Sequence, residues 1–278
     1  MQIGEILPVT TTNKRVFLLV TLLIALVGLA REIQGQASDA IDRELDLMRN
    51  GSEAQRIRGF YDLLQPDNRA KPFRASIAFK ALLQRVPGRV NDLETSFIKT
   101  LNIENDYVRR ANRTNGTLTE EYSNYYGDLI SAVSVVRDER SISALVGAIG
   151  TGNMATGALA SIGSPAVDVV ITSLRDPDKR NRQGAAITLG KMIGPESRVR
   201  EDAPSVRKIK HALETALSDP NANVRISTID SLALLRDDDV IRDLETISRR
   251  DPYKITRGAG QAFYPVREAA RKALAANQ

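Results

Sequence analysis

Residues 174–194 read LRDPDKRNRQGAAITLGKMIG, and residues 217–235 repeat the same pattern as LSDPNANVRISTIDSLALL. In both stretches an apolar segment ends at an Asp-Pro pair, and an arginine follows six residues after the aspartate. The arginines Arg182, Arg225 and Arg267 recur at intervals of 43 and 42 residues, each with a leucine seven residues later. Because proline cannot continue a helix, each unit is predicted to be a helix, an Asp-Pro turn and a second helix opened by the arginine.

A period near 40 residues that is built from two helices predicts a stacked repeat, because each unit buries its apolar face only against its neighbours. No convincing strand pattern accompanies it. We therefore expect an all-α fold, a HEAT-type α-solenoid of stacked antiparallel helix pairs. The quoted segments resemble HEAT repeats, especially the short bacterial kind named after phycobilisome lyase HEAT-like repeats. We assign residues 138–278 to these repeats and residues 38–137 to irregular helical repeats.

The resemblance implies roles for the repeated residues. In HEAT proteins the turn aspartate and the following arginine form a ladder that ties one repeat to the next, and Asp219 with Arg225 is the best example here. Leu189, Leu232 and Leu274 are expected to be core residues. Upstream, apolar residues spaced by three and four flank the segment 50–53, which predicts an antiparallel helical hairpin.

The N-terminus carries an export signal. Residues 16–30, VFLLVTLLIALVGLA, contain no charge and follow Lys14 and Arg15. This resembles a secretory signal peptide, since fifteen apolar residues are fewer than the roughly 20 that a spanning helix needs. Small residues sit at the spacing of a cleavage site in Gly28-x-Ala30 and in Gly35-x-Ala37, and we favour cleavage after Ala37. Residues 1–37 are therefore the predicted signal peptide, with an uncleaved anchor as the alternative. Both predict export to the periplasm or cell envelope, with membrane contact only through an uncleaved N-terminal segment.

Composition excludes much of enzyme chemistry. The chain has 278 residues, no cysteine and one histidine, His211, with a formal net charge of +5. Thiolate zinc sites, iron–sulfur clusters and multi-histidine metal sites are therefore excluded. The run GTGNMA from Gly150 matches a degenerate dinucleotide fingerprint but lacks a preceding strand, so we interpret it as a tight turn. Residues 237–239, three aspartates, are interpreted as a helix cap. We expect no catalysis, no cofactor and no metal.

Three groups of residues are candidate binding sites. The first is an aromatic stripe at helical spacing, for which burial in the core is the alternative. The second is the C-terminal part of a segment rich in cations that runs from Lys179 to Lys210. The third is an insertion in the last repeat, residues 252–264. Their members are Tyr122, Tyr125 and Tyr126; Arg198, Arg200, Arg207, Lys208 and Lys210; and Phe263 and Tyr264.

These features predict an exported HEAT-repeat scaffold that binds a protein partner. The alternative is a nucleic-acid-binding HEAT-like protein whose basic concave face resembles that of HEAT-like DNA glycosylases. Export argues against DNA, and no aromatic residue lies within the basic band to stack on a base. The oligomeric state and the identity of the partner do not follow from the sequence.

Overall fold

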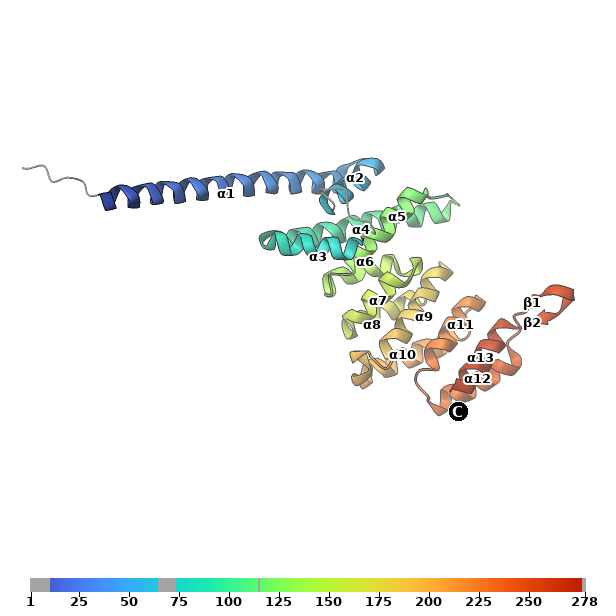
Figure 1. Cartoon of the computed structure of the whole chain (residues 1–278). Helices are drawn as coiled ribbons and strands as arrows, with labels where there is room; N and C mark the ends of the chain where they lie inside the picture. Colours follow the sequence, from blue (N-terminus) through green and yellow to red (C-terminus); the bar gives the residue numbers. More distant parts are fainter. Residues whose placement is uncertain (1–10, 65–73, 115, 277–278) are drawn as a thin grey trace, which may run out of the picture. The chain divides into compact units, whose positions relative to one another are not determined.

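The computed structural model describes residues 11–64, 74–114 and 116–276, and its contacts divide the chain into two units at residue 66. Most of the described residues are helical, with one two-stranded sheet among them (Figure 1). The prediction of an all-α chain is confirmed in this sense. The predicted domain boundaries at residues 37 and 137 stay predictions, and the two units are described separately below.

The first unit is a helical hairpin of α1 (Thr11–Asn50) and α2 (Glu53–Leu64). The turn is held by a capping box: Ser52 N–H donates to Gln55 Oε1 at 2.8 Å, and Gln55 N–H donates to Ser52 Oγ at 3.4 Å. The predicted hairpin is therefore confirmed. Its buried side chains come from one face of each helix, namely Ile41, Leu45 and Met48 on α1 and Ile57, Phe60, Leu63 and Leu64 on α2.

The N-terminal part of α1 exposes apolar side chains, unlike the part that packs on α2. Leu26, Val27 and Leu29 are 55%, 46% and 55% exposed, and no atom lies within 4 Å of a Cβ placed on Gly28. The predicted cleavage point after Ala37 falls within this helix, before Ile41, which is the first buried side chain among those of α1 whose burial is described. Within the described residues that could be searched, no single helix has the length and apolarity of a membrane span. One bent pair, Asn153–Ile162 with Ser164–Ser173, meets those criteria only when its two helices are taken together, by length and composition.

The second unit is a succession of helices that pack on their neighbours along the chain (Figure 1). Its α-helices are α3 (Ala75–Arg85), α4 (Val90–Arg113), α5 (Glu120–Val133), α6 (Ile142–Gly147), α7 (Asn153–Ile162), α8 (Val167–Ser173), α9 (Lys179–Ile193), α10 (Ala203–Ala216), α11 (Ala222–Leu232), α12 (Asp238–Arg250) and α13 (Pro265–Ala276). Its short 3-10 turns are η1 (Pro87–Arg89), η2 (Glu139–Ser141), η3 (Ile149–Thr151), η4 (Ser164–Ala166), η5 (Arg198–Glu201) and η6 (Gly258–Gly260). Helix α9 contacts α7 and α11, and α11 in turn contacts α13, so alternate helices form a continuous row.

An arginine ladder links successive Asp-Pro turns. Arg182 on α9 donates Nε to Asp219 Oδ2 at 2.7 Å and Nη2 to Asp219 Oδ1 at 3.0 Å. Arg225 on α11 makes the equivalent pair with Asp251, at 2.8 and 2.9 Å. Both carboxylates are only 7% exposed as side chains. These are bidentate, partly desolvated pairs, which are stronger than surface ion pairs.

The predicted partner of Arg225 needs a correction. Arg225 does contact Asp219, but through the main chain: its Nη1 donates to the Asp219 carbonyl at 2.8 Å. The Asp219 carboxylate instead accepts from Arg182 of the preceding repeat. Each arginine thus holds the carbonyl of its own turn and the carboxylate of the next turn, because the neighbouring turn lies beside it in the row of helices.

The insertion at residues 252–264 forms a small hairpin, contrary to the expectation of a chain without strands. Strands β1 (Ile255–Thr256) and β2 (Ala262–Phe263) pair antiparallel between α12 and α13. Arg267 Nε still donates to the Asp251 carbonyl at 2.7 Å, although sixteen residues separate them instead of six. The hairpin therefore loops out of the turn without breaking the ladder contact.

The core residues follow the repeat. Leu189 and Leu232 are fully buried, as predicted, and Val224, Ile229 and Leu213 accompany them. Leu274 is half-buried instead of buried, and the inner positions of α13 are taken by the small residues Ala270 and Ala273. Helix α13 has its main contacts with α11 and α12, which leaves the side of Leu274 partly open.

Candidate functional site

The aromatic stripe of α5 lies in the core. Tyr122, Tyr125 and Tyr126 are 1%, 0% and 5% exposed, which matches the alternative that the sequence left open. The hydroxyls of Tyr122 and Tyr125 donate to the two oxygens of Glu104 on α4, at 2.6 and 3.2 Å. The hydroxyl of Tyr126 donates to Asn105 Oδ1 at 2.5 Å. These rings are not presented to solvent as a peptide-binding stripe would be.

Two polar residues of α4 organise this core, and the sequence analysis did not single them out. Glu104 is fully buried between tyrosine hydroxyls, and Asn105 donates from Nδ2 to the Ala144 carbonyl of α6 at 2.8 Å. Burial raises the pKa of the Tyr126 hydroxyl well above its ordinary value. Tyr126 therefore stays protonated, and the network of hydrogen bonds holds α4, α5 and α6 together. A glutamate within an apolar helical face was the signal available in the sequence.

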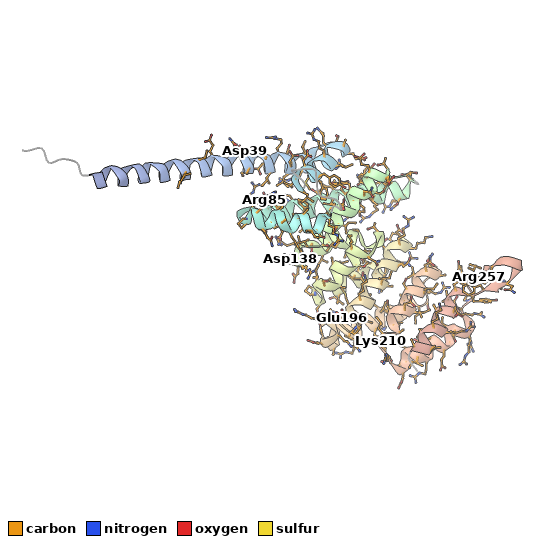
Figure 2. All side chains as sticks on the ribbon, in the orientation of Figure 1. Asp39, Arg85, Asp138, Glu196, Lys210 and Arg257 are labelled. Carbon is orange, nitrogen blue, oxygen red and sulfur yellow. The ribbon has the colours of Figure 1, made fainter. Side chains whose placement is uncertain are left out.

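The basic band divides into paired and unpaired cations. Lys208 donates to Asp168 at 2.9 Å, and Lys210 donates to Asp237 Oδ1 at 2.7 Å (Figure 2 labels Lys210). The hydrogen bond that Lys210 donates to Asp237 is the main reason that the pKa of Lys210 is raised. Asp237 also caps α12, as predicted, by accepting from the main chain of Asp239 and Val240 at 3.0 and 3.4 Å. Lys208 and Lys210 are therefore engaged within the chain.

The remaining cations of the predicted set face solvent. Arg198, Arg200 and Arg207 are exposed, and none has a carboxylate partner in the described part of the chain. In the insertion, Phe263 and Tyr264 are half-buried beneath arginines: Arg257 lies 3.3 Å from the Phe263 ring centroid, and Arg267 lies 4.1 Å from that of Tyr264. These two rings support the hairpin and its junction with α13 through cation–π contacts.

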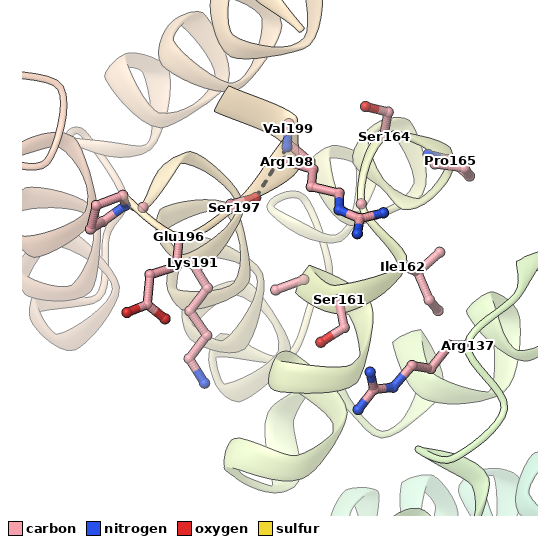
Figure 3. A pocket seen from close by; sticks show the side chains of 14 residues that line it. Arg137, Ser161, Ile162, Ser164, Pro165, Lys191, Glu196, Ser197, Arg198 and Val199 are labelled. Carbon is pink, nitrogen blue, oxygen red and sulfur yellow. Dashed lines mark hydrogen bonds between the residues drawn. The ribbon is translucent and has the colours of Figure 1, made fainter. Parts of the chain in front are cut away.

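One cavity is lined by cations that form no ion pair with described residues and that come from segments distant in sequence. We call it the basic pocket. It has a volume of about 890 Å³ and lies where the chain leaves α5, α7 and α9. Figure 3 shows Arg137, Lys191 and Arg198 around it, with Ser161 and Ile162 between them. Its full lining is Arg137, Ala160, Ser161, Ile162, Gly163, Ser164, Pro165, Lys191, Gly194, Pro195, Glu196, Ser197, Arg198 and Val199.

Local structure positions these side chains. Gly163, with φ of +84°, reverses the chain after α7, a conformation that a side chain would disfavour. Ser197 Oγ accepts from Val199 N–H at 3.2 Å, which starts η5 and places Arg198 beside the pocket. Lys191 lies in the last turn of α9 and donates to Thr156 Oγ1 at 3.0 Å. Of the predicted binding residues, only Arg198 lines this pocket.

A second cavity of about 740 Å³ lies near the tyrosine core. It is lined by Tyr126 and Asn105 on one side and by the turn from Asp176 to Asn181 on the other. Two of its cations are engaged: Arg180 donates to Asn112 at 3.4 Å and Arg109 to Asp106 at 3.5 Å. Two carboxylates, Asp176 and Asp178, also line it, so its charge is mixed.

The features weighed for cofactor or metal chemistry are accounted for by turns and caps. Gly152, with φ of +138°, separates η3 from α7 in the predicted tight turn, and the described residues around it contain no strand. No group of three or more His, Asp or Glu side chains suited to a metal ion was found in the residues that the structure describes. His211 is exposed on α10.

No protein-family model matches the chain. No curated protein sequence matches it either.

Proposed function

We propose that this protein is an exported helical-repeat scaffold of HEAT type that binds a protein partner and performs no catalysis. The observation that carries the proposal is the arginine ladder. Arg182 and Arg225 bridge successive Asp-Pro turns with the same bidentate geometry, at the spacing of the sequence repeat. A contact that recurs once per repeat is what a stack of equivalent helix pairs requires.

Export is supported by the contacts of α1. Removal of residues 1–37 leaves Ile41, Leu45 and Met48, the residues that pack on α2. The segment that would be removed presents Leu26, Val27 and Leu29 to solvent around the helix. A helix that is apolar on all sides needs a lipid or protein environment, or is removed after export. Cleavage after Ala37 and retention as an anchor are both compatible with this arrangement, and both place the protein outside the cytoplasm.

A binding role is supported by the distribution of polar groups. The buried polar clusters, Glu104 with its tyrosines and the arginine ladder, have their hydrogen bonds made within the chain. The basic pocket is instead a cavity with exposed, unpaired cations. Nucleic acid is the alternative partner. The pairing of Lys208 and Lys210 with carboxylates weakens it, as does the lack of an aromatic residue in the pocket lining.

Mass spectrometry of the native N-terminus in separated cytoplasmic, periplasmic and membrane fractions tests export. We expect a chain starting at Ser38 outside the cytoplasm, or an intact chain in the membrane fraction. An intact chain in the soluble cytoplasm would contradict export and would favour nucleic acid as the partner. Co-purification of a tagged full-length chain from solubilised envelope, against a tagged unrelated exported protein, then tests for a protein partner.

A further inference from the structure

The basic pocket indicates the kind of partner that the scaffold binds. This inference rests on the proposed function and makes that function more specific. Three cations line the cavity, Arg137, Lys191 and Arg198, against one carboxylate, Glu196. All four side chains are exposed, and no ion pair joins them to one another or to other described residues. An excess of unpaired positive charge in a cavity attracts an anionic ligand.

The carboxylates of Asp138 and Asp202, which lie close to these cations in sequence, are engaged with other residues and form no ion pair with them. Asp138, next to Arg137, forms an ion pair with Arg140 at 2.6 Å, and Arg140 also binds Glu94 at 2.6 Å. Hydrogen bonds from Arg140 hold the pKa of Asp138 below its usual range, so it stays ionised and paired. Asp202, close to η5, accepts from the hydroxyls of Ser164 at 3.0 Å and Ser205 at 2.6 Å.

The three cations lie near the C-terminal ends of helices and have no carboxylate partner among the described residues. Lys191 is in the last turn of α9, and Arg137 and Arg198 follow α5 and α9. The C-terminal end of a helix carries partial negative charge, which favours the cation of Lys191 in the last turn of α9. In Figure 3 the side chain of Arg198 lies above Ser161 and that of Arg137 lies below it. Guanidinium groups held this way present planar donors suited to bidentate binding of carboxylates.

The size and lining of the pocket select the ligand class. A volume of about 890 Å³ accommodates several residues of a peptide and is at the upper end for a small-molecule pocket. Ile162, Pro165 and Val199 supply apolar surface, and Ser161 supplies a hydroxyl. No aromatic ring lines it, whereas binding of single-stranded nucleic acid uses stacked rings. We infer that the basic pocket binds an acidic peptide segment of the protein partner, with Arg137, Lys191 and Arg198 contacting its carboxylates.

Fluorescence anisotropy on the full chain tests this inference with three labelled probes: hexaglutamate, hexaglutamine and a dodecameric oligothymidine. We expect hexaglutamate to bind, hexaglutamine not to bind, and added salt to weaken binding, since exposed charges are screened. The variant Arg137→Glu/Arg198→Glu is expected to weaken hexaglutamate binding at least tenfold, which corresponds to about 1.4 kcal/mol. The matched control is Arg242→Glu/Arg249→Glu, which makes the same charge change on α12, where both side chains are more than 70% exposed.

Several outcomes would overturn the inference. Equal weakening by both double variants would show that only net charge matters. Stronger binding of oligothymidine with the same dependence on Arg137 and Arg198 would assign the pocket to nucleic acid. Displacement of bound oligothymidine by inorganic pyrophosphate, with no binding of hexaglutamate, would assign the pocket to a phosphate ligand. If the double variant fails to fold by circular dichroism, Arg137→Gln/Arg198→Gln replaces it. If a protein partner from the cell envelope binds these variants as tightly as the unaltered chain, the inference about the pocket is overturned and the scaffold proposal is retained.

Discussion

Replacing Asp219 with alanine is expected to destabilise the second unit strongly, because this carboxylate joins two repeats. It accepts two hydrogen bonds from Arg182, at 2.7 and 3.0 Å, and one from the Asn221 main chain at 2.8 Å. The Asp219 and Arg182 side chains are 7% and 14% exposed. Removing one member of such a pair leaves a poorly solvated charge, and the usual loss for buried pairs is about 3–5 kcal/mol.

We take the low end of that range, about 3 kcal/mol, because Arg182 keeps its bonds to the carbonyls of Asp176 and Pro177. For a unit of this size the loss corresponds to a fall in Tm of about 6–12 °C. Differential scanning calorimetry and urea unfolding measure it. The matched control is Asp168→Ala, which removes an exposed pair with Lys208 at 2.9 Å and is expected to cost at most about 1 kcal/mol.

A double-mutant cycle separates the pair from the rest of the site. Arg182→Met and Asp219→Ala should be strongly non-additive, since each alone removes the same contact. If Asp219→Ala lowers the free energy of unfolding no more than Asp168→Ala, or if the cycle is additive, the ladder does not hold the repeats together and the reasoning is refuted.

Three further results are expected. Gly184→Ala should cost about 1–3 kcal/mol of stability, because a Cβ there would overlap a main-chain carbonyl of η3. Gly157→Ala, with open space around it, should instead stabilise α7 by up to about 1 kcal/mol. Equal melting temperatures of the two variants would contradict the packing of α9 on η3. Leu232→Ala should cost about 2–5 kcal/mol in urea unfolding and Leu274→Ala clearly less, because only Leu232 is fully buried; the reverse order would contradict the register. In acid, the free energy of unfolding should fall below about pH 4. Burial opposes the ionised form of Asp219, but hydrogen bonds from Arg182 and Asn221 outweigh burial and lower the pKa of this carboxyl. The stabilisation is therefore complete above the pKa of the unfolded chain, about 3.9, and is lost as the pH falls through the lower pKa of the folded chain. Unfolding followed from pH 7 to pH 2 should be less steep in Asp219→Ala than in the unaltered chain.

Features encoded within one repeat were predictable from the sequence. The Asp-Pro turns and the helices that start near Arg182 and Arg225 follow from local backbone rules and from a spacing that repeats. The hairpin around Ser52 follows from the capping box Ser52 to Gln55. Both depend on residues a few positions apart, where propensity and hydrogen bonding decide the structure.

Features that depend on stacking were not predictable in detail. The sequence places Asp219 near Arg225, yet its carboxylate pairs with Arg182, because the relative placement of neighbouring helices decides which side chain reaches it. The basic pocket has the same origin, since Arg137 and Arg198 lie in turns far apart along the chain. Helical spacing identified the tyrosines of α5, but burial against Glu104 decided their role as core residues.

Site-specific photo-crosslinking in living cells tests the central claim most directly, that the exported chain is a scaffold whose basic pocket contacts a protein partner. A photoreactive phenylalanine analogue replaces Ser161, an exposed residue of the pocket lining, and in a second strain Thr246, an exposed residue of α12. The account predicts a discrete protein adduct in the envelope fraction from position 161, absent from position 246 and lost with Arg137→Glu/Arg198→Glu. No adduct from position 161, or the same adduct from both positions, would contradict it.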